Sequence, residues 1–289
     1  MTMSSPGSDL QQAAAWLRAA DGLLITAGAG MGIDSGLPDF RGPGGFWAAY
    51  PALGRARIAF ESITNPAAFA SDPALAWGFY GHRLDLYRRT EPHAGFRLLL
   101  GMAAEKPHGA WVFTSNVDGQ FAKAGFAAGR ICEIHGSIHH LQCSRPCCDA
   151  IWSAAAFRPE VDEARCHLRN DAPLCPRCAA VARPNILMFN DWNWVERRTA
   201  LQYQRLRDWL DSVERLVCIE LGAGTHIPTV RRFSEQAGGR LIRINPLEAA
   251  LPDPASGLSL PLGALAGCQA LADHLPQPAE PGQVPVPAQ

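Results

Sequence analysis

A glycine-rich turn follows an apolar segment near the start of the chain. The run "TAGAGMGIDSGLPDFRG", from Thr26 to Gly42, comes directly after "GLLI". Glycines after a strand let the backbone approach a pyrophosphate, whose charge amide N–H groups and a helix N-terminus then stabilise. Ile33 stands where the dinucleotide fingerprint G-x-G-x-x-G needs glycine, so the turn predicts phosphate binding without the full fingerprint. The charged pair Asp39 and Arg41 follows closely, which suggests chemistry on the molecule that carries the phosphate.

Cysteines cluster in the middle of the chain. Cys175-Pro-Arg-Cys178 is a C-x-x-C pair, and the upstream run "CSRPCCD" supplies Cys143 with either Cys147 or Cys148. Two such pairs predict a tetrahedral zinc site, and Cys147 is preferred because it departs less from the C-x-x-C spacing. The alternative is that some of these residues are buried or redox-active thiols. A site filled by four thiolates has no open position, so the zinc is expected to be structural.

Composition limits the class of protein. The chain has 289 residues, 47% hydrophobic and 18% charged, with a net charge of -1. These values are typical of a globular domain and give no electrostatic reason to expect nucleic acid. No apolar run is long enough to span a membrane, and the N-terminus lacks the pattern of a secretory signal. Together with nine cysteines, these features predict a cytoplasmic location without membrane partners.

Short β-rich runs alternate with helical stretches. The expected strands are residues 22–26, 110–114, 130–135, 214–221 and 240–245. This alternation predicts an α/β fold with a Rossmann-like, doubly wound parallel sheet. The cysteine-rich segment interrupts the rhythm and is expected to form a small inserted zinc-binding module. Residues 276–289 are proline-rich and are expected to be a disordered tail.

Several motifs together resemble one family, the sirtuins, which are NAD-dependent protein deacylases. The family's opening G-A-G-x-S-x-x-S-G-x-P-D-F-R-G is similar to residues 28–42, with Gly32 in place of a serine. Its T-Q-N-[IV]-D is similar to "TSNVD" at 114–118, and its catalytic H-G to "HGS" at 135–137. Its R-P-x-x-V-x-F-G-E is similar to "RPNILMFND" at 183–191. The motifs stand in the family's order.

The resemblance implies a catalytic domain over residues 9–275. Its NAD-binding Rossmann-like part would comprise about 9–45, 94–138 and 212–275, with a small helical part at 46–93 and a zinc module at 139–198. NAD and an acylated lysine of a protein substrate would meet between these parts.

The resemblance also assigns roles to individual residues. His135 would be the general base and Asn116 would assist it at the catalytic centre. The residues expected to bind NAD are Gly28, Ala29, Gly30, Asp39, Phe40, Arg41, Ser115, Asn116, Asp118, Gly222, Gly224 and Asn245. The residues expected beside the acyl-lysine substrate are Tyr80, Arg83, Ile186 and Phe189. The expected zinc ligands are Cys143, Cys147, Cys175 and Cys178.

The implied reaction transfers an acyl group from lysine to ADP-ribose. In the family, the acyl oxygen attacks C1′ of the nicotinamide ribose, nicotinamide leaves, and a base then activates a ribose hydroxyl. A histidine whose ordinary pKa is near neutrality suits that second step. Tyr80 and Arg83 lie three apart on an expected helix, like the Y-x-x-R of the branch that removes malonyl and succinyl groups. A guanidinium pairs well with the carboxylate of such an acyl group.

The chain departs from the family at several motif positions. Ser115 replaces the motif glutamine, and Asn190-Asp191 replaces Gly-Glu. The expected activity is deacylation of acetyl-, malonyl- or succinyl-lysine, with release of nicotinamide and O-acyl-ADP-ribose. The departures leave two alternatives on the same scaffold: an ADP-ribosyltransferase or NAD glycohydrolase, and a non-catalytic NAD-binding protein.

Overall fold

A parallel sheet forms the larger part of the molecule. The computed structural model describes residues 6–38 and 42–276. The sheet has the strand order β11-β10-β9-β1-β2-β3. Its strands are β1 (Gly22–Ala27), β2 (Ala110–Thr114), β3 (Ile131–Glu133), β9 (Leu216–Leu221), β10 (Arg240–Ile244) and β11 (Gly257–Leu260). Counted along the chain within this sheet, the order is that of the Rossmann fold, as the sequence predicts.

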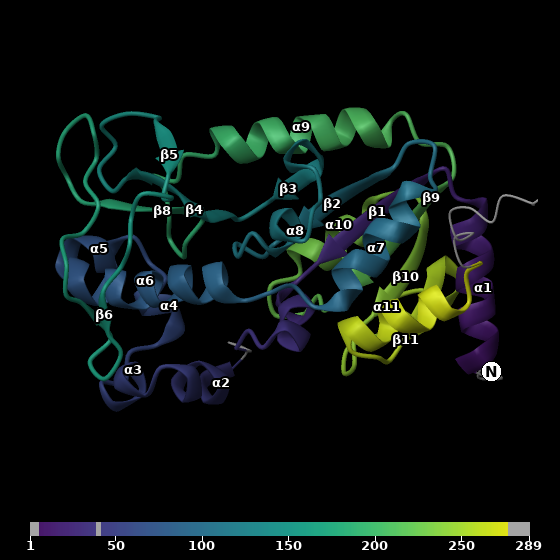
Figure 1. Cartoon of the computed structure of the whole chain (residues 1–289), viewed down its shortest axis with the longest axis horizontal. Coiled ribbons are helices and arrows are strands. Elements are labelled where there is room, and N and C mark those ends of the chain that lie inside the picture. Colours follow the sequence, from purple (N-terminus) through teal and green to yellow (C-terminus); the bar gives the residue numbers. More distant parts are fainter. Residues whose placement is uncertain (1–5, 39–41, 277–289) are drawn as a thin grey trace, which may run out of the picture.

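Helices cover both faces of the sheet (Figure 1). One face packs against α1 (Pro6–Ala19), α7 (Ala94–Ala104) and α11 (Ala264–Asp273) through residues such as Leu17, Leu99 and Leu271. The other face packs against α9 (Arg197–Leu210) and α10 (Thr229–Gln236) through Leu206, Trp209 and Val230. The central strands are buried between these layers: all six residues of β1 and of β9 are buried. The prediction of a doubly wound sheet is therefore confirmed.

Short connecting elements lie at both edges of the sheet: two follow β1 and β2, and two directly precede β3 and β11. They are η1 (Ala29–Ser35), α8 (Gln120–Lys123), η2 (Ala128–Arg130) and η3 (Pro254–Ser256).

A second, smaller part contains a helical group and a cysteine-rich group. The helices are α2 (Gly42–Ala49), α3 (Pro51–Arg55), α4 (Phe60–Ile63), α5 (Ala67–Ser71) and α6 (Pro73–Arg89). The strands are β4 (Gly136–Cys143), β5 (Ile151–Ser153), β6 (Val161–Asp162), β7 (His167–Leu168) and β8 (Ala182–Ile186). β5, β4 and β8 form an antiparallel sheet, and β6 pairs with β7 as a hairpin.

Helix α6 joins the two groups of this smaller part. It begins at Pro73, where the Asp72 carboxylate accepts a hydrogen bond from the Leu75 amide at 2.9 Å. Gly78 faces the β6–β7 hairpin, and a Cβ there would lie 1.9 Å from the Cys166 carbonyl oxygen. Any other residue at this position would push the hairpin away. The glycine therefore lets the cysteine-rich group pack directly on the helix that carries Tyr80 and Arg83.

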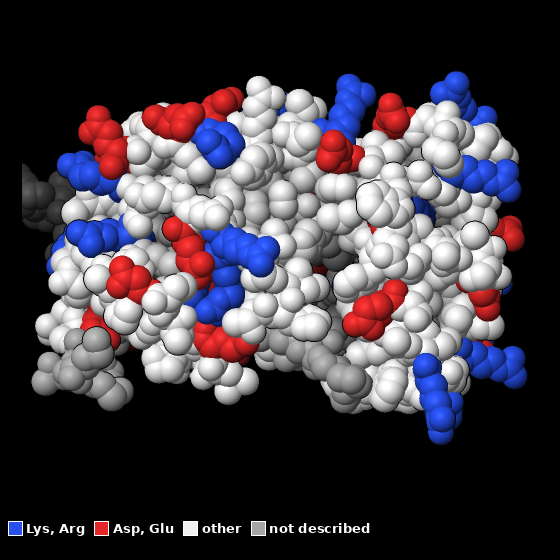
Figure 2. All heavy atoms as spheres, turned by 180° about the vertical axis from the view of Figure 1, so that it is seen from behind, with Lys and Arg blue, Asp and Glu red and all other residues white. Residues whose placement is uncertain are grey.

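The charges on the surface are mixed in sign. Figure 2 shows Lys and Arg beside Asp and Glu across one face, separated by uncharged residues. Among the described residues, no helix is both long and apolar enough to cross a membrane.

Candidate active site

The glycine turn lies where the topology of the sheet changes direction. β1 pairs with β2 on one side and with β9 on the other, so the carboxyl ends of β1 and β9 border the switch point where such sheets bind ligands. Gly28 follows β1 and Gly222 follows β9. The Gly30 amide donates to the Gly222 carbonyl at 3.0 Å. Both turns therefore lie together at the predicted crevice.

The two turns approach each other so closely that side chains cannot fit between them. A Cβ on Gly28 would lie 2.8 Å from the Ala223 Cα, and a Cβ on Gly222, whose φ is 57°, would lie 2.4 Å from the Gly30 carbonyl carbon. A turn of bare backbone is the structure that a dinucleotide pyrophosphate requires, so these residues fit NAD. Ala29 is exposed and Gly30 and Gly224 are half-buried at the same edge.

Asn245 fixes the shape of this crevice from β10. Its Nδ2 donates to the Ala223 carbonyl at 2.9 Å, and its Oδ1 accepts from the amides of Leu247 and Glu248. The side chain is 1% exposed. Asn245 therefore acts in this structure by holding the turn after β9 in place.

Asn116 connects the end of β2 to the glycine turn. Its Nδ2 donates to the Gly28 carbonyl at 2.9 Å, and its amide donates to the Thr114 hydroxyl at 3.0 Å. The Ser115 amide donates to the Ala27 carbonyl at 3.1 Å, which continues the pairing of β2 with β1. The motif "TSNVD" thus lies beside the glycine turn, as the resemblance implies.

Asp118 is a buried carboxylate on the same loop. Its Oδ1 accepts from the Gln120 amide at 2.9 Å, and the residue is 8% exposed. The pKa of Asp118 is raised to about 6, chiefly by burial; the hydrogen bond from the Gln120 amide and the charge of Arg83 oppose the rise, and the charge of Glu133 adds to it. The backbone carbonyl of Asp118 accepts from Nε2 of His139 at 2.9 Å, which fixes that nitrogen as the protonated one. His139 is not among the predicted site residues, and the structure places it against this loop.

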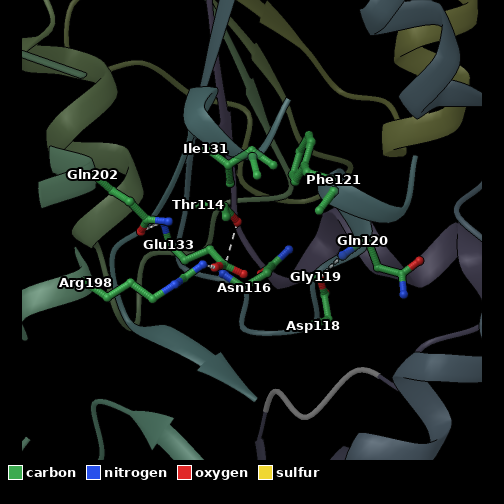
Figure 3. A pocket seen from close by; sticks show the side chains of 12 residues that line it. Thr114, Asn116, Asp118, Gly119, Gln120, Phe121, Ile131, Glu133, Arg198 and Gln202 are labelled. Atoms are coloured by element: carbon green, nitrogen blue, oxygen red, sulfur yellow. Dashed lines mark hydrogen bonds and ion pairs between the residues drawn. The ribbon is translucent and has the colours of Figure 1, made fainter. Parts of the chain in front are cut away.

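A small cavity lies behind the loop. Figure 3 shows side chains of β2, β3, α8 and α9 converging on it, with Asn116, Glu133 and Arg198 close to one another. Its volume is about 40 Å³, roughly enough for one water molecule.

His135 stands between the large sheet and the cysteine-rich group. It follows β3 and precedes β4, and its carbonyl accepts from the Leu187 amide at 2.9 Å. Gly136 has a φ of 80°, and a Cβ there would lie 2.1 Å from the Asn185 carbonyl oxygen. The glycine of the H-G pair is therefore needed for the approach of β8. Burial lowers the pKa of His135, so the imidazole is neutral at pH 7 and able to accept a proton.

The segment after β8 passes from His135 toward the helical group. Ile186 pairs with Gly136 and is buried. Phe189 donates its amide to the Thr64 carbonyl at 2.9 Å, and its ring lies 6.2 Å from that of Phe60. These two predicted substrate residues therefore lie on one segment that continues past His135.

Tyr80 and Arg83 are both buried on α6. Arg83 donates to the Tyr87 hydroxyl from Nε at 3.0 Å and from Nη2 at 2.7 Å. Its guanidinium carbon lies 5.2 to 5.8 Å from the ring centroids of Phe79, Tyr80 and Tyr87. The structure places a buried cation in aromatic surroundings at the predicted acyl-recognition position.

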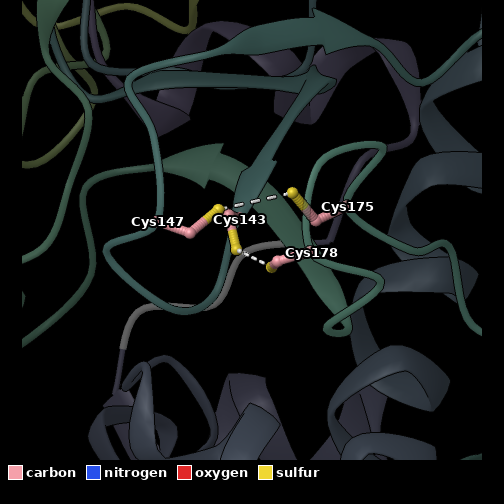
Figure 4. A group of neighbouring side chains, drawn as sticks. All are labelled: Cys143, Cys147, Cys175 and Cys178. Carbon is pink, nitrogen blue, oxygen red and sulfur yellow. Dashed lines mark hydrogen bonds between the residues drawn. The ribbon is translucent and has the colours of Figure 1, made fainter.

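Four cysteines converge from the end of β4, the loop after it and the loop before β8 (Figure 4). The Sγ atoms of Cys143, Cys147, Cys175 and Cys178 all lie within 4.8 Å of one another. The Cys143–Cys178 and Cys147–Cys175 separations are both 3.6 Å. A tetrahedron with Zn–S bonds of about 2.3 Å has edges of roughly 3.8 Å, so the arrangement fits zinc. Cys148 is outside the cluster, although its Sγ is 3.5 Å from that of Cys147.

Three predicted site residues, Asp39, Phe40 and Arg41, lie outside the described residues, as does the proline-rich tail beyond 276. The remaining predicted residues lie at the carboxyl edge of the sheet, at the end of β8 and the segment after it, on α6 and in the cysteine cluster.

Comparison with known proteins agrees with this geometry. The model of the Sir2 family matches residues 28–219. The chain belongs to the Sir2 family. The predicted resemblance to sirtuins is therefore confirmed. An NAD-dependent protein deacylase 2 of Pseudomonas aeruginosa is 32% identical over 85% of this Sir2-family chain and 88% of its own length. The mitochondrial NAD-dependent protein deacylase sirtuin-5 of Danio rerio is 27% identical over 82% of this chain and 77% of its own length.

The fold also matches solved Sir2 structures. The crystal structure of a Sir2 homologue in complex with NAD superposes with a TM-score of 0.69 at 22% identity, covering 91% of this Sir2-family chain and 93% of the other. The fold expected from the motifs, a Rossmann-like sheet with a small zinc-binding module, is confirmed.

Proposed function

We propose that this chain is an NAD-dependent protein lysine deacylase that releases nicotinamide and O-acyl-ADP-ribose. The position of His135 supports the proposal: it follows β3 of the parallel sheet, and its carbonyl accepts from Leu187 on the segment that continues β8. The relatives described above are named NAD-dependent protein deacylases and match most of the chain. Their names favour deacylation over an ADP-ribosyltransferase or NAD glycohydrolase.

Several of the predicted site residues receive a role in this proposal. NAD, when bound, supplies the ribose carbon that accepts the acyl oxygen and the nicotinamide that leaves. Gly28, Gly30 and Gly222 would hold its phosphates through backbone groups. Asn116 and Asp118 would orient the nicotinamide ribose. The unprotonated imidazole nitrogen of His135 would accept a proton from a ribose hydroxyl.

The proposed acyl group is acidic. Arg83 is a buried guanidinium among aromatic rings, and a succinyl or malonyl carboxylate is the anion that suits it. The guanidinium carbon of Arg83 lies 5.8 Å from the centroid of the Tyr80 ring, and the Tyr80 hydroxyl would donate to the same carboxylate. The acetyl group of acetyl-lysine has no negative charge to pair with Arg83.

The proposal also covers the role of the zinc module and the cellular location of the protein. Zinc bound by the cysteine cluster would stabilise the module without entering the reaction, because four thiolates leave no open position. Its thiolates persist in a reducing compartment, which supports the cytoplasmic location expected from the sequence. The domain limits given above, with NAD-binding segments on both sides of the inserted parts, are retained as part of the proposal.

The test is a mass-spectrometric assay with purified protein, NAD and matched acetyl-, malonyl- and succinyl-lysine peptides, with nicotinamide release followed in parallel. We expect lysine to be released fastest from the acidic acyl peptides. Arg83→Met should remove that preference while leaving slow deacetylation. Nicotinamide release with every peptide intact would refute deacylation and support an NAD hydrolase.

A further inference from the structure

Glu133 is a buried acidic residue on β3, two residues before His135. Its side chain is 8% exposed, and the other residues of β3 are apolar or weakly polar and buried. A carboxylate in this position costs free energy unless it is paired. The Glu133 carboxylate is paired with Arg198 of α9.

Three side chains in the first turns of α9 contact the carboxylate, the carbonyl and the amide of Glu133. Nη2 of Arg198 donates to its carboxylate at 2.5 Å, and the hydroxyl of Thr199 donates to its carbonyl at 3.1 Å. The Glu133 amide donates to Oε1 of Gln202 at 3.2 Å. Figure 3 shows Arg198 and Gln202 reaching Glu133 from the same helix.

Ile134 and His135, the two residues after Glu133, are bonded to two other elements. The Ile134 amide donates to the Thr114 carbonyl at 2.9 Å, which ties the chain to β2. The His135 carbonyl accepts from Leu187 after β8. Three consecutive residues are thus fixed to three different elements, and α9 supplies the contact to Glu133.

We propose that Glu133, held by Arg198, is a positioning residue that places His135 for proton transfer. The inference rests on the proposed function, in which His135 is the base. Glu133 acts through the backbone, since its side chain is directed to α9. Its charge matters because the ion pair fixes the carboxylate, and with it the strand end, more rigidly than a neutral hydrogen bond would.

The variant Glu133→Gln tests the ion pair while keeping the size of the side chain and both backbone contacts. Arg198→Lys keeps the positive charge opposite Glu133 and should lose less activity than Glu133→Gln. Asp21→Asn is the matched control: Asp21 is also buried and pairs with Arg215, but it lies at the amino end of β1, away from the site.

Three measurements distinguish a loss of His135 positioning from a general loss of folded structure: kcat for deacylation, nicotinamide exchange and the Kd for NAD. If His135 is displaced, the base-dependent stage of the reaction should slow more than the earlier stage that releases nicotinamide. We expect kcat for deacylation to fall roughly 10- to 100-fold in Glu133→Gln, the effect of a small misplacement. Exchange of labelled nicotinamide into NAD, and the Kd for NAD measured by calorimetry, should change less than about 3-fold. Asp21→Asn should match the wild type in all three.

Hydrogen–deuterium exchange gives a readout that does not depend on activity. Protection of residues 131–138 should fall in Glu133→Gln, while Tm and protection elsewhere stay close to wild type. Unchanged protection of this segment, or deacylation and nicotinamide exchange falling in the same proportion, would overturn the positioning role. A wild-type protein that leaves every acyl peptide intact would instead overturn the proposed function, and the exchange data would still decide whether Glu133 fixes the strand end.

Discussion

Arg183 and Asp191 form a salt bridge of 2.8 Å between two side chains that are both fully buried. Asp191 also accepts hydrogen bonds from the amides of Met188 and Asn193, so one carboxylate holds the whole turn after β8. The sequence replaces the sirtuin Gly-Glu with Asn190-Asp191. The structure keeps a buried carboxylate in this turn and pairs it with an arginine from β8.

Removing that carboxylate should be strongly destabilising. Asp191→Ala leaves the Arg183 guanidinium buried without its ion partner, which typically costs about 3–5 kcal/mol. Urea denaturation of the zinc-loaded protein measures the change. Asp85→Asn is the control, because the Asp85–Arg89 pair is more than half exposed and should contribute less than about 0.5 kcal/mol. Similar losses in both variants would contradict the role of the buried pair.

Asn190 adopts the backbone conformation that a glycine would favour. Its φ is 54°, in the left-handed region that asparagine tolerates better than most residues. Asn190→Gly should leave the free energy of unfolding within about 0.5 kcal/mol of wild type, whereas Asn190→Val should cost roughly 1–3 kcal/mol. Thermal unfolding of the two variants distinguishes them, and equal stability of both would show that this conformation is not under strain.

Neighbouring cysteines should differ sharply in zinc binding. Cys147→Ser removes a ligand and should lower zinc affinity by more than the roughly 10- to 100-fold that outer-shell changes cause. Cys148→Ser should retain one zinc per chain, because Cys148 is not part of the cluster. Metal analysis after dialysis against a weak chelator measures both. Zinc retained by Cys147→Ser and lost from Cys148→Ser would reassign the fourth ligand.

The ionised carboxylate of Asp118 should lower the free energy of unfolding at neutral pH. Its pKa rises from 3.8 to about 6 on folding, so the folded state binds the proton more tightly and stability falls as pH rises through this window. At pH 8, Asp118→Asn should therefore raise the free energy of unfolding by up to about 3 kcal/mol. At pH 5 the gain should be smaller than at pH 8 by about 1 kcal/mol. Denaturation at the two pH values tests this. An equal gain at both would mean that the carboxylate does not titrate there.

The pH profile of deacylation should show loss of activity only on the acid side of neutrality. Burial lowers the pKa of His135 below 6.5, so the base becomes protonated, and inactive, only below that pH. Asp118 takes up a proton near pH 6 and should steepen the same limb. Rates of acyl-peptide cleavage from pH 5 to 8 would test this. An acid limb centred above pH 7 would exclude the depressed pKa of His135.

The sequence predicts the parts of this site that depend on local chemistry. The glycine turn, the cysteine pairs and the H-G step need particular residue types at fixed spacings, and each is readable from the chain. The contacts of Glu133 with Arg198 and of Gln142 with Asn185 are not, because both pairs join residues more than 40 positions apart. The one sequence signal for Glu133 is its charge within the apolar run "RICEIH".

The pairing of β1 with β9 also sets when the NAD crevice can form. Gly22 and Leu216 are aligned across this pair, so the whole helical and cysteine-rich insertion must be synthesised before the two strands meet. Contacts this distant in the chain form late, because loop closure precedes any gain from pairing. A nascent chain that ends before β9 has the glycine turn but lacks half of the crevice. The ability to bind NAD therefore appears only in the final stage of synthesis, and it can serve as a marker of complete folding.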